Sequence, residues 1–254
     1  MNASTENNCL IEDGRAFKSR RKISFGQCGP DGKLKLSEIL RYCSDLVTDL
    51  YSAHGCTRAF LAEHGYAQLV SRSTFHVNSF PRENDVLYIT VSEEKSQIFQ
   101  AVRSYEFKDE KGNVLVEGKS TWVFVEPESR RIVKTSDFEY LIASDKETDF
   151  PVPDRVRVSS DVEPVFLGAQ KILLSHADAN GHLTNSKYID FAIDFLPQEF
   201  RKKTLTDFKI NYSKEIYPDE VMEVFGCFCE KDRRIVVTGK NNGTVCFECE
   251  LLYL

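Results

Sequence analysis

The chain has 254 residues, of which 41% are hydrophobic and 11% aromatic, as in globular proteins that bury a core. Its length allows one large domain or two of ordinary size. The net charge of −6 argues against nucleic acid or an anionic membrane as a general partner, and no apolar run is long enough to span a membrane. Because the first residues also lack the apolar segment of a secretory signal, a cytoplasmic protein is expected.

Cysteine usage predicts reduced thiols. The eight cysteines are scattered along the chain. Cys246 and Cys249 have C-x-x-C spacing, but they lie in a segment that alternates like a strand, and no second pair follows at zinc spacing. Neither a disulfide framework nor a metal site is expected.

The first half of the chain reads as one helix followed by strands. Residues 1–14 are expected to form a mobile tail. Apolar residues at i, i+3, i+4 and i+7 predict a helix over 34–50. Strands are predicted from alternating apolar residues and turn residues, with a hairpin turn at 109–113. These strands cover residues 73–80, 85–94, 98–109 and 112–126.

The second half repeats this order. Residues 127–160 are charged and contain two prolines, so they are predicted to be a linker with at most a short helix around 138–143. A helix over 185–197, ended by Pro197, is apolar around most of its circumference and is expected to be buried. Strands are then predicted over residues 206–213, 220–230, 233–242 and 244–254, with a turn at 241–243.

The two halves also match in sequence. Residues 31–40 align with 180–189, and 75–86 align with 208–221 in the same order. This indicates an internal duplication of an α+β unit. One long helix followed by a twisted antiparallel sheet, occurring twice, is typical of two tandem hotdog units, in which a sheet wraps around a central helix. The units are predicted over 15–126 and 161–254.

One short segment carries the chemistry. Asp178, Asn180 and His182 fall within five residues, directly before the second helix. Asp or Asn before a helix is an ordinary cap, and Gly181 is an ordinary turn residue. A carboxylate that orients a histidine is equally a catalytic pattern. From the residues alone, both interpretations stay open.

A family resemblance favours the catalytic interpretation. Residues 178–191, DANGHLTNSKYIDF, resemble the D-x-N-x-H-V-N-N-x-x-Y segment of plant and bacterial acyl-acyl carrier protein thioesterases. Residues 210–216, INYSKEI, are similar to the L-E-Y-R-R-E-C segment of that family, which places Glu215 on the glutamate implicated in catalysis. The resemblance extends over residues 15–254. It implies hydrolysis of fatty acyl-acyl carrier protein to free fatty acid and holo carrier protein, without cofactor or metal. The residues on positions of the first motif are Asp178, Asn180, His182, Asn185 and Tyr188.

Some positions depart from the family pattern. Ile216 stands where the family has a cysteine, so a nucleophilic cysteine is excluded at that position. The other departures remove none of the four expected catalytic groups. They are Leu183 for Val, Thr184 for Asn, and Phe191 or Ala192 where a Trp is common.

The resemblance assigns roles to the site residues. Glu215 would be the general base that takes a proton from water. His182 would orient that water or polarise the thioester, and Asp178 would hold His182 or Asn180 in position. Asn180 would donate an amide hydrogen bond, and backbone N–H groups of residues 181–184 would stabilise the oxyanion.

One expectation concerns the position of Glu215. If Phe208, Ile210 and Tyr212 face the core, strict alternation puts Glu215 on the opposite face of the strand. A bulge or bend around 213–215 is therefore expected.

The first half lacks these groups, since Gly29, Asp31 and Lys33 stand at the positions of Asp178, Asn180 and His182. By resemblance it would bind the acyl chain, although core packing explains the candidate lining residues equally well. These candidates are Phe60, Leu61, Tyr66, Leu69 and Val70. The remaining histidines are expected to be non-catalytic: His54, His64, His76 and His176.

The expected partner is an acidic acyl carrier protein, for which basic segments 130–134 and 201–203 are candidate contacts. A homodimer is compatible with the sequence. Three other functions stay open: an acyl-CoA thioesterase, a non-catalytic regulator that binds acyl thioesters, and a hotdog dehydratase. The dehydratase would leave the D-x-N-x-H pattern unexplained.

Overall fold

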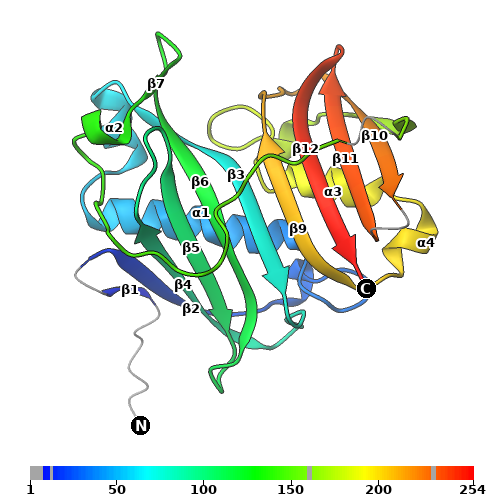
Figure 1. Ribbon diagram of the computed structural model, residues 1–254, viewed down its shortest axis with the longest axis horizontal. Coiled ribbons are helices and arrows are strands. Elements are labelled where there is room, and N and C mark those ends of the chain that lie inside the picture. Colours follow the sequence, from blue (N-terminus) through cyan, green and yellow to red (C-terminus); the bar gives the residue numbers. More distant parts are fainter. Residues whose placement is uncertain (1–7, 12–13, 159–161, 230–232) are drawn as a thin grey trace. The chain divides into compact units, whose positions relative to one another are not determined.

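The computed structural model describes residues 8–11, 14–158, 162–229 and 233–254. The chain forms two compact units, each with a helix lying against an antiparallel sheet (Figure 1). The N-terminal unit comprises Met1–Val70 and Val77–Val152, and the C-terminal unit comprises Ser71–His76 and Pro153–Leu254.

The sheet of the N-terminal unit is antiparallel throughout. Strand β1 (Asn8–Ile11) pairs with β2 (Ala16–Lys22), and β4 (Val86–Glu94), β5 (Ala101–Lys108) and β6 (Val114–Glu126) follow in that order. A short strand, β7 (Arg131–Val133), pairs with the end of β6, and β3 (Ala67–Val77) begins in this unit.

The central helix of this unit is α1 (Leu36–Ala53), which confirms the helix predicted over 34–50. Its buried stripe packs against β2 and β4, as the apolar spacing requires. A second helix, α2 (Arg58–Glu63), was not predicted; the Thr57 side chain caps it by accepting from Phe60 N–H at 3.1 Å. Among the described residues, no helix combines the length and apolarity needed to cross a bilayer.

The C-terminal unit has the same organisation. Residues 72–76 of β3 pair with β9 (Leu205–Tyr212), followed by β12 (Thr244–Tyr253), β11 (Arg234–Asn241), β10 (Val221–Cys229) and β8 (Val165–Lys171). Helix α3 (Lys187–Asp194) packs against β11 and β12. It is shorter than predicted, because Pro197 does not simply end it but begins a separate helix, α4 (Gln198–Arg201).

The eight predicted strands are all present, whereas β1, β2, β7 and β8 were not predicted. Residues 8–11 of the expected tail form β1; residues 1–7 and 12–13 lie outside the described part of the chain. Within the expected linker, β7 pairs with β6. Phe138 is buried and its ring stacks on that of Phe124, with the ring centroids 3.8 Å apart. Residues 138–143, where at most a short helix was expected, form no helix, and a single 3₁₀ turn occupies Thr135–Asp137.

The duplication extends to individual backbone hydrogen bonds. The N-terminal loop (residues 24–35) and the C-terminal loop (residues 173–184) each contain a 3₁₀ turn, η1 (Phe25–Gln27) and η3 (Leu174–His176). In each loop a bridge closes the turn, Cys28 with Leu34 and Ala177 with Leu183. Matching bonds are Gly29 N–H to Lys33 O at 2.8 Å and Asp178 N–H to His182 O at 3.0 Å. The predicted α+β duplication is confirmed: each unit is a hotdog-type sheet around its own helix.

Candidate active site

The C-terminal loop is held in shape by Asp178. Its Oδ1 accepts from the backbone N–H of Asn180 at 2.7 Å, and its carbonyl oxygen accepts from Gly181 N–H at 2.9 Å. Gly181 has φ of +82°, a left-handed conformation that glycine adopts at little cost. This tight turn directs the side chain of His182 inward, where the residue is only 8% exposed.

His182 lies between two carboxylates. Its Nδ1 is 3.9 Å from Asp178 Oδ1, and its Nε2 is 3.7 Å from Glu215 Oε1. Nδ1 also lies 3.3 Å from the carbonyl oxygen of Leu183. The three predicted side chains are therefore brought together, with both carboxylates at ion-pair distance and beyond direct hydrogen bonding.

Glu215 reaches the site because the chain leaves the sheet after β9. The backbone N–H groups of Ser213 and Lys214 both donate to the carbonyl oxygen of Cys246, at 2.8 and 3.2 Å, so the ladder is irregular where a bulge or bend was expected. Ile216 is nevertheless fully buried, in phase with the buried Ile210 of β9. Glu215 thus lies on the face of the segment opposite Ile216. On that face its Oε1 approaches Nε2 of His182 at 3.7 Å.

Sequence reasoning missed Tyr217. Its hydroxyl donates to Glu215 Oε2 at 2.9 Å, and its ring lies edge-on to the His182 imidazole with centroids 6.4 Å apart. Tyr217 could have been found from its spacing to Glu215, because residues two apart in an extended segment share a face. The buried Ile216 between them fixes that face for Glu215 and Tyr217 alike.

The expected amide donors are only partly available. Gly181, Leu183 and Thr184 donate their N–H groups to the carbonyl oxygens of Asp178, Ile216 and His176. Of the group 181–184, this leaves the N–H of His182, for which no acceptor is found within the described residues. The side chain of Asn180 is exposed and makes no hydrogen bond to the described part of the chain.

Tyr188 contacts the segment that carries Glu215. It is buried on α3, and its hydroxyl donates to Lys214 O at 3.5 Å. Burial raises the pKa of this phenol above its ordinary value, so it stays protonated. His176 lies close in sequence but is engaged elsewhere: its Nδ1 accepts from Leu173 N–H at 3.2 Å.

The N-terminal unit has the same scaffold with different side chains. Leu34 N–H donates to Pro81 O at 2.8 Å, as Leu183 N–H does to Ile216 O at 2.8 Å. Where His182 faces Glu215, the ammonium of Lys33 lies 5.2 Å from the ring centroid of Phe80. Matching backbone hydrogen bonds thus hold acid–base groups in the C-terminal unit. In the N-terminal unit they hold a lysine that makes a cation–π contact and lies 3.4 Å from Asp31 Oδ2.

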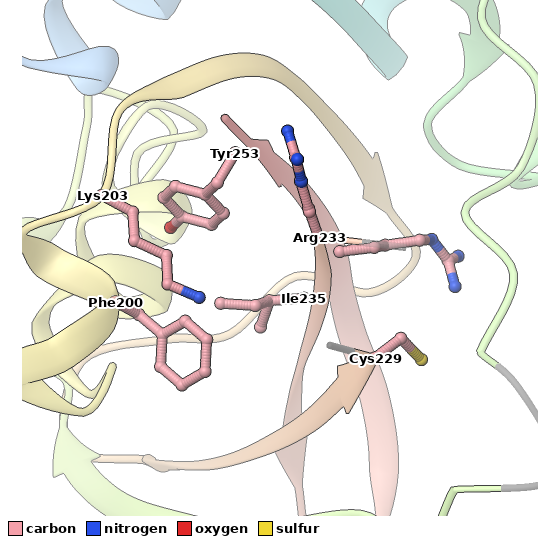
Figure 2. A pocket seen from close by; sticks show the side chains of 7 residues that line it. Phe200, Lys203, Cys229, Arg233, Ile235 and Tyr253 are labelled. Carbon is pink, nitrogen blue, oxygen red and sulfur yellow. The ribbon is translucent and has the colours of Figure 1, made fainter. Parts of the chain in front are cut away.

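A small pocket lies on another part of the C-terminal unit (Figure 2). The ammonium of Lys203, from the basic segment 201–203, lies 4.4 Å from the ring centroid of Phe200 on its rim. The lining contains none of the four predicted catalytic residues. It consists of Phe200, Lys203, Cys229, Arg233, Arg234, Ile235 and Tyr253. Across the described residues, no three His, Cys, Asp or Glu side chains are grouped closely enough to hold a metal ion.

Comparison with curated proteins finds plant relatives. The chain is 22% identical over 232 residues to oleoyl-acyl carrier protein thioesterase 1, chloroplastic, of Arabidopsis thaliana, covering 84% of this chain and 64% of that protein. It is 22% identical over 258 residues to oleoyl-acyl carrier protein thioesterase 2, chloroplastic, of the same plant, covering 92% and 69%. The chain therefore spans just under two thirds of the first of these relatives.

Solved structures share the fold. An acyl-ACP thioesterase from Bacteroides thetaiotaomicron superposes with a TM-score of 0.85 at 19% identity, covering 96% of this chain and all of that one (100%). The 12:0-ACP thioesterase from Umbellularia californica gives a TM-score of 0.80 at 14% identity, covering 94% and 97%.

Family models match both halves. The acyl-ACP thioesterase N-terminal domain matches residues 14–141, and the acyl-ACP thioesterase C-terminal domain matches residues 170–245. The resemblance seen in the two sequence motifs is thereby confirmed. This chain belongs to the acyl-ACP thioesterase family.

Proposed function

We propose that this protein hydrolyses fatty acyl-acyl carrier protein to free fatty acid and holo carrier protein. The observation that carries the proposal is the position of His182, buried between the carboxylates of Asp178 and Glu215 at 3.9 and 3.7 Å. An imidazole between two acids, in a member of this family, is suited to activate water.

In the proposed reaction, Glu215 removes a proton from a water molecule that attacks the thioester carbonyl carbon. Half of the Glu215 side chain is open to solvent, at 47% exposure, so water has access to it. His182 orients the water through Nε2, and Asp178 holds the imidazole from the Nδ1 side. The tetrahedral intermediate collapses as the C–S bond breaks, and the proton on Glu215 passes to the departing thiolate of the carrier.

Charge on the carbonyl oxygen would be stabilised at the same loop. The N–H of His182 and the side-chain amide of Asn180 are the donors left free by the hydrogen bonds of the loop. Losing one such donor typically costs about 10²–10³ in rate.

The two units would divide the work. The C-terminal unit supplies the chemistry, and the N-terminal unit, whose matching loop carries Lys33 in place of His182, binds the acyl chain. Basic segment 201–203 is a proposed contact for the acidic carrier protein, as is segment 130–134. A cytoplasmic location and a homodimer also stay predictions.

The test is release of free thiol from the same acyl chain carried on acyl carrier protein and on coenzyme A. His182→Ala and Glu215→Gln are each expected to lower kcat/KM at least about a hundredfold. Lys33→Ala, the matched change in the loop of the N-terminal unit, is expected to leave turnover unchanged.

Each outcome decides a different point. Faster turnover of the coenzyme A thioester than of the carrier-bound one would replace the substrate by an acyl-CoA. Full activity in folded Glu215→Gln would transfer the base role to Asp178. A folded wild type that hydrolyses neither thioester would make the protein a non-catalytic binder.

A further inference from the structure

An open cleft of about 300 Å³ lies on the face of the N-terminal sheet that is turned away from α1. Arg103 on β5 faces α1, since its guanidinium lies 4.8 Å from the ring centroid of Tyr51. Val102 therefore points to the other face, where Glu94 of β4 lies directly opposite it in register. Both residues line the cleft, whose volume is at the lower end of the range for small-molecule sites.

The segment after β7 forms the other wall of the cleft. It runs across the strands of the sheet on the side away from α1 (Figure 1), and Lys95 N–H donates to Lys146 O at 2.8 Å. Thr148, Phe150 and Val152 of this segment line the cleft. The cleft is thus formed within the N-terminal unit alone, between β4–β6 and residues 146–152.

The floor of the cleft is a buried ion pair. Lys119 Nζ lies 2.5 Å from Glu94 Oε2, and each side chain is only 2% exposed. Lys119 also donates to Thr148 O at 3.1 Å, and Thr148 Oγ1 donates to Glu94 Oε1 at 2.8 Å. Within the described residues, these contacts use two of the three N–H groups of the ammonium and two of about four acceptor positions of the carboxylate. One charged donor therefore remains beside free acceptor positions.

The charges around the cleft are balanced. At the rim, Lys95 Nζ lies 3.0 Å from Glu147 Oε1, so the charged lining residues are two lysines and two glutamates. An anion that reached Lys119 would also meet the carboxylate of Glu94, and a cation at Glu94 would meet the ammonium, so repulsion offsets the attraction in both cases. Because the other walls are largely apolar, the cleft fits a neutral molecule with a polar head and an apolar body. These walls include Val102, Phe150 and Val152.

We propose that the cleft binds a small neutral carboxamide. The carbonyl oxygen of the ligand accepts from Lys119 Nζ, and its N–H donates to Glu94 Oε2. The oxygen and nitrogen of an amide share one carbon, through bonds of about 1.23 and 1.33 Å, and therefore lie about 2.2 Å apart. This separation is close to the 2.5 Å between Nζ and Oε2, so two parallel hydrogen bonds form at once. The apolar body lies against Phe150.

Three probes of the same shape test the proposal: benzamide, which is neutral, benzoate, which is an anion, and benzamidine, which is a cation at neutral pH. Each is titrated into the full-length protein while the backbone amide NMR signals of residues 94–97 and 147–152 are followed. Benzamide is expected to bind saturably. Benzoate and benzamidine are expected to bind at least about tenfold more weakly, because each replaces one hydrogen bond to a charged group by a contact between like charges.

A change of charge in the floor should change the preferred probe. Glu94→Gln keeps the shape of the floor and removes its negative charge, so benzoate is expected to become the tightest ligand, by about tenfold over benzamide. Glu106→Gln makes the same change in a solvent-accessible ion pair of β5, where Lys108 Nζ lies 3.0 Å from Glu106 Oε2. This control is expected to leave all three affinities unchanged.

A second variant leaves the ion pair intact, since breaking a buried pair can prevent folding. Phe150→Ala removes the aromatic wall and is expected to weaken benzamide binding about fivefold or more. It decides the matter if Glu94→Gln does not fold. His182→Ala, in the loop of the C-terminal unit, is expected to leave benzamide binding unchanged.

The proposal is overturned if benzamide causes no saturable change in the signals of the cleft, or if benzoate or benzamidine binds as tightly as benzamide. It is equally overturned if folded Glu94→Gln keeps the wild-type preference, or if folded Phe150→Ala binds benzamide as the wild type does.

Discussion

The backbone N–H of Leu183 donates to the carbonyl oxygen of Ile216 at 2.8 Å, and both side chains are fully buried. This bond joins the two segments that carry His182 and Glu215, each one residue away from it. The 3.7 Å approach of imidazole to carboxylate thus depends on a backbone hydrogen bond between two buried residues beside it.

The first prediction concerns the buried side chain of Ile216. Ile216→Ala is expected to lower the free energy of unfolding by about 2–4 kcal/mol, because it leaves a cavity beneath the site. It should also lower kcat more than it changes KM, since Glu215 loses its fixed position. Denaturant unfolding and steady-state kinetics measure the two effects. Ile216→Val, expected to cost about 1 kcal/mol with kcat retained, is the control. Unchanged stability in Ile216→Ala would contradict this account.

Tyr217 is predicted to position the general base. Tyr217→Phe removes the 2.9 Å hydrogen bond to Glu215 Oε2 and leaves the ring in place. A hydrogen bond to a charged group contributes about 1.5–3 kcal/mol, so kcat is expected to fall by about tenfold or more with KM little changed. An unaltered kcat in folded Tyr217→Phe would contradict a positioning role for Tyr217.

The sequence predicted the elements that carry strong periodicity. The buried stripe of α1 and the alternating strands β4–β6 and β9–β12 could all be predicted, because the core that they face sets their apolar spacing. Strand β8 was not predicted for a physical reason. Several residues of β8, such as Val165 and Phe166, are exposed, so its pattern does not alternate between core and solvent.

The site was foreseeable in part. Asp178, His182 and Glu215 came from motifs. The approach of Glu215 to His182, 33 positions apart in the sequence, and the sharing of Cys246 O by Ser213 and Lys214 belong to tertiary structure. The engagement of Gly181, Leu183 and Thr184 N–H groups in the loop could not be read from spacing. Alternation could have identified Tyr217 once Ile216 was taken as buried.

Thiol chemistry gives a third prediction. Ile216 replaces a cysteine of the family pattern, and burial raises the pKa of the Cys43 and Cys246 thiols, which disfavours the reactive thiolate. Maleimide at neutral pH should therefore modify the half-buried Cys56 well before Cys43 or Cys246. Turnover is expected to survive that modification. Peptide mapping by mass spectrometry, alongside thiol-release assays with the reagent removed, gives both readouts. Activity lost in step with labelling of one cysteine would contradict the assignment of water as nucleophile.

The duplicated loops supply a matched pair of glycines for the last prediction. Gly181 and Gly32 have φ of +82° and +73°. A Cβ added at Gly181 would meet no atom within 4 Å, and one added at Gly32 would meet only Arg82 Nη1, at 3.6 Å. Substitution by Ala therefore strains the backbone in both loops, by about 1–2 kcal/mol, without a steric clash.

The two substitutions should cost similar stability but differ in activity. Gly181→Ala shifts the turn that aims His182 and is expected to lower kcat about tenfold or more. Gly32→Ala strains the loop that carries Lys33 and should leave kcat unchanged. Gly181→Asn, which tolerates the left-handed conformation, is expected to restore part of the activity. Equal losses of kcat in Gly181→Ala and Gly32→Ala would mean that global stability, and not the aim of His182, limits turnover.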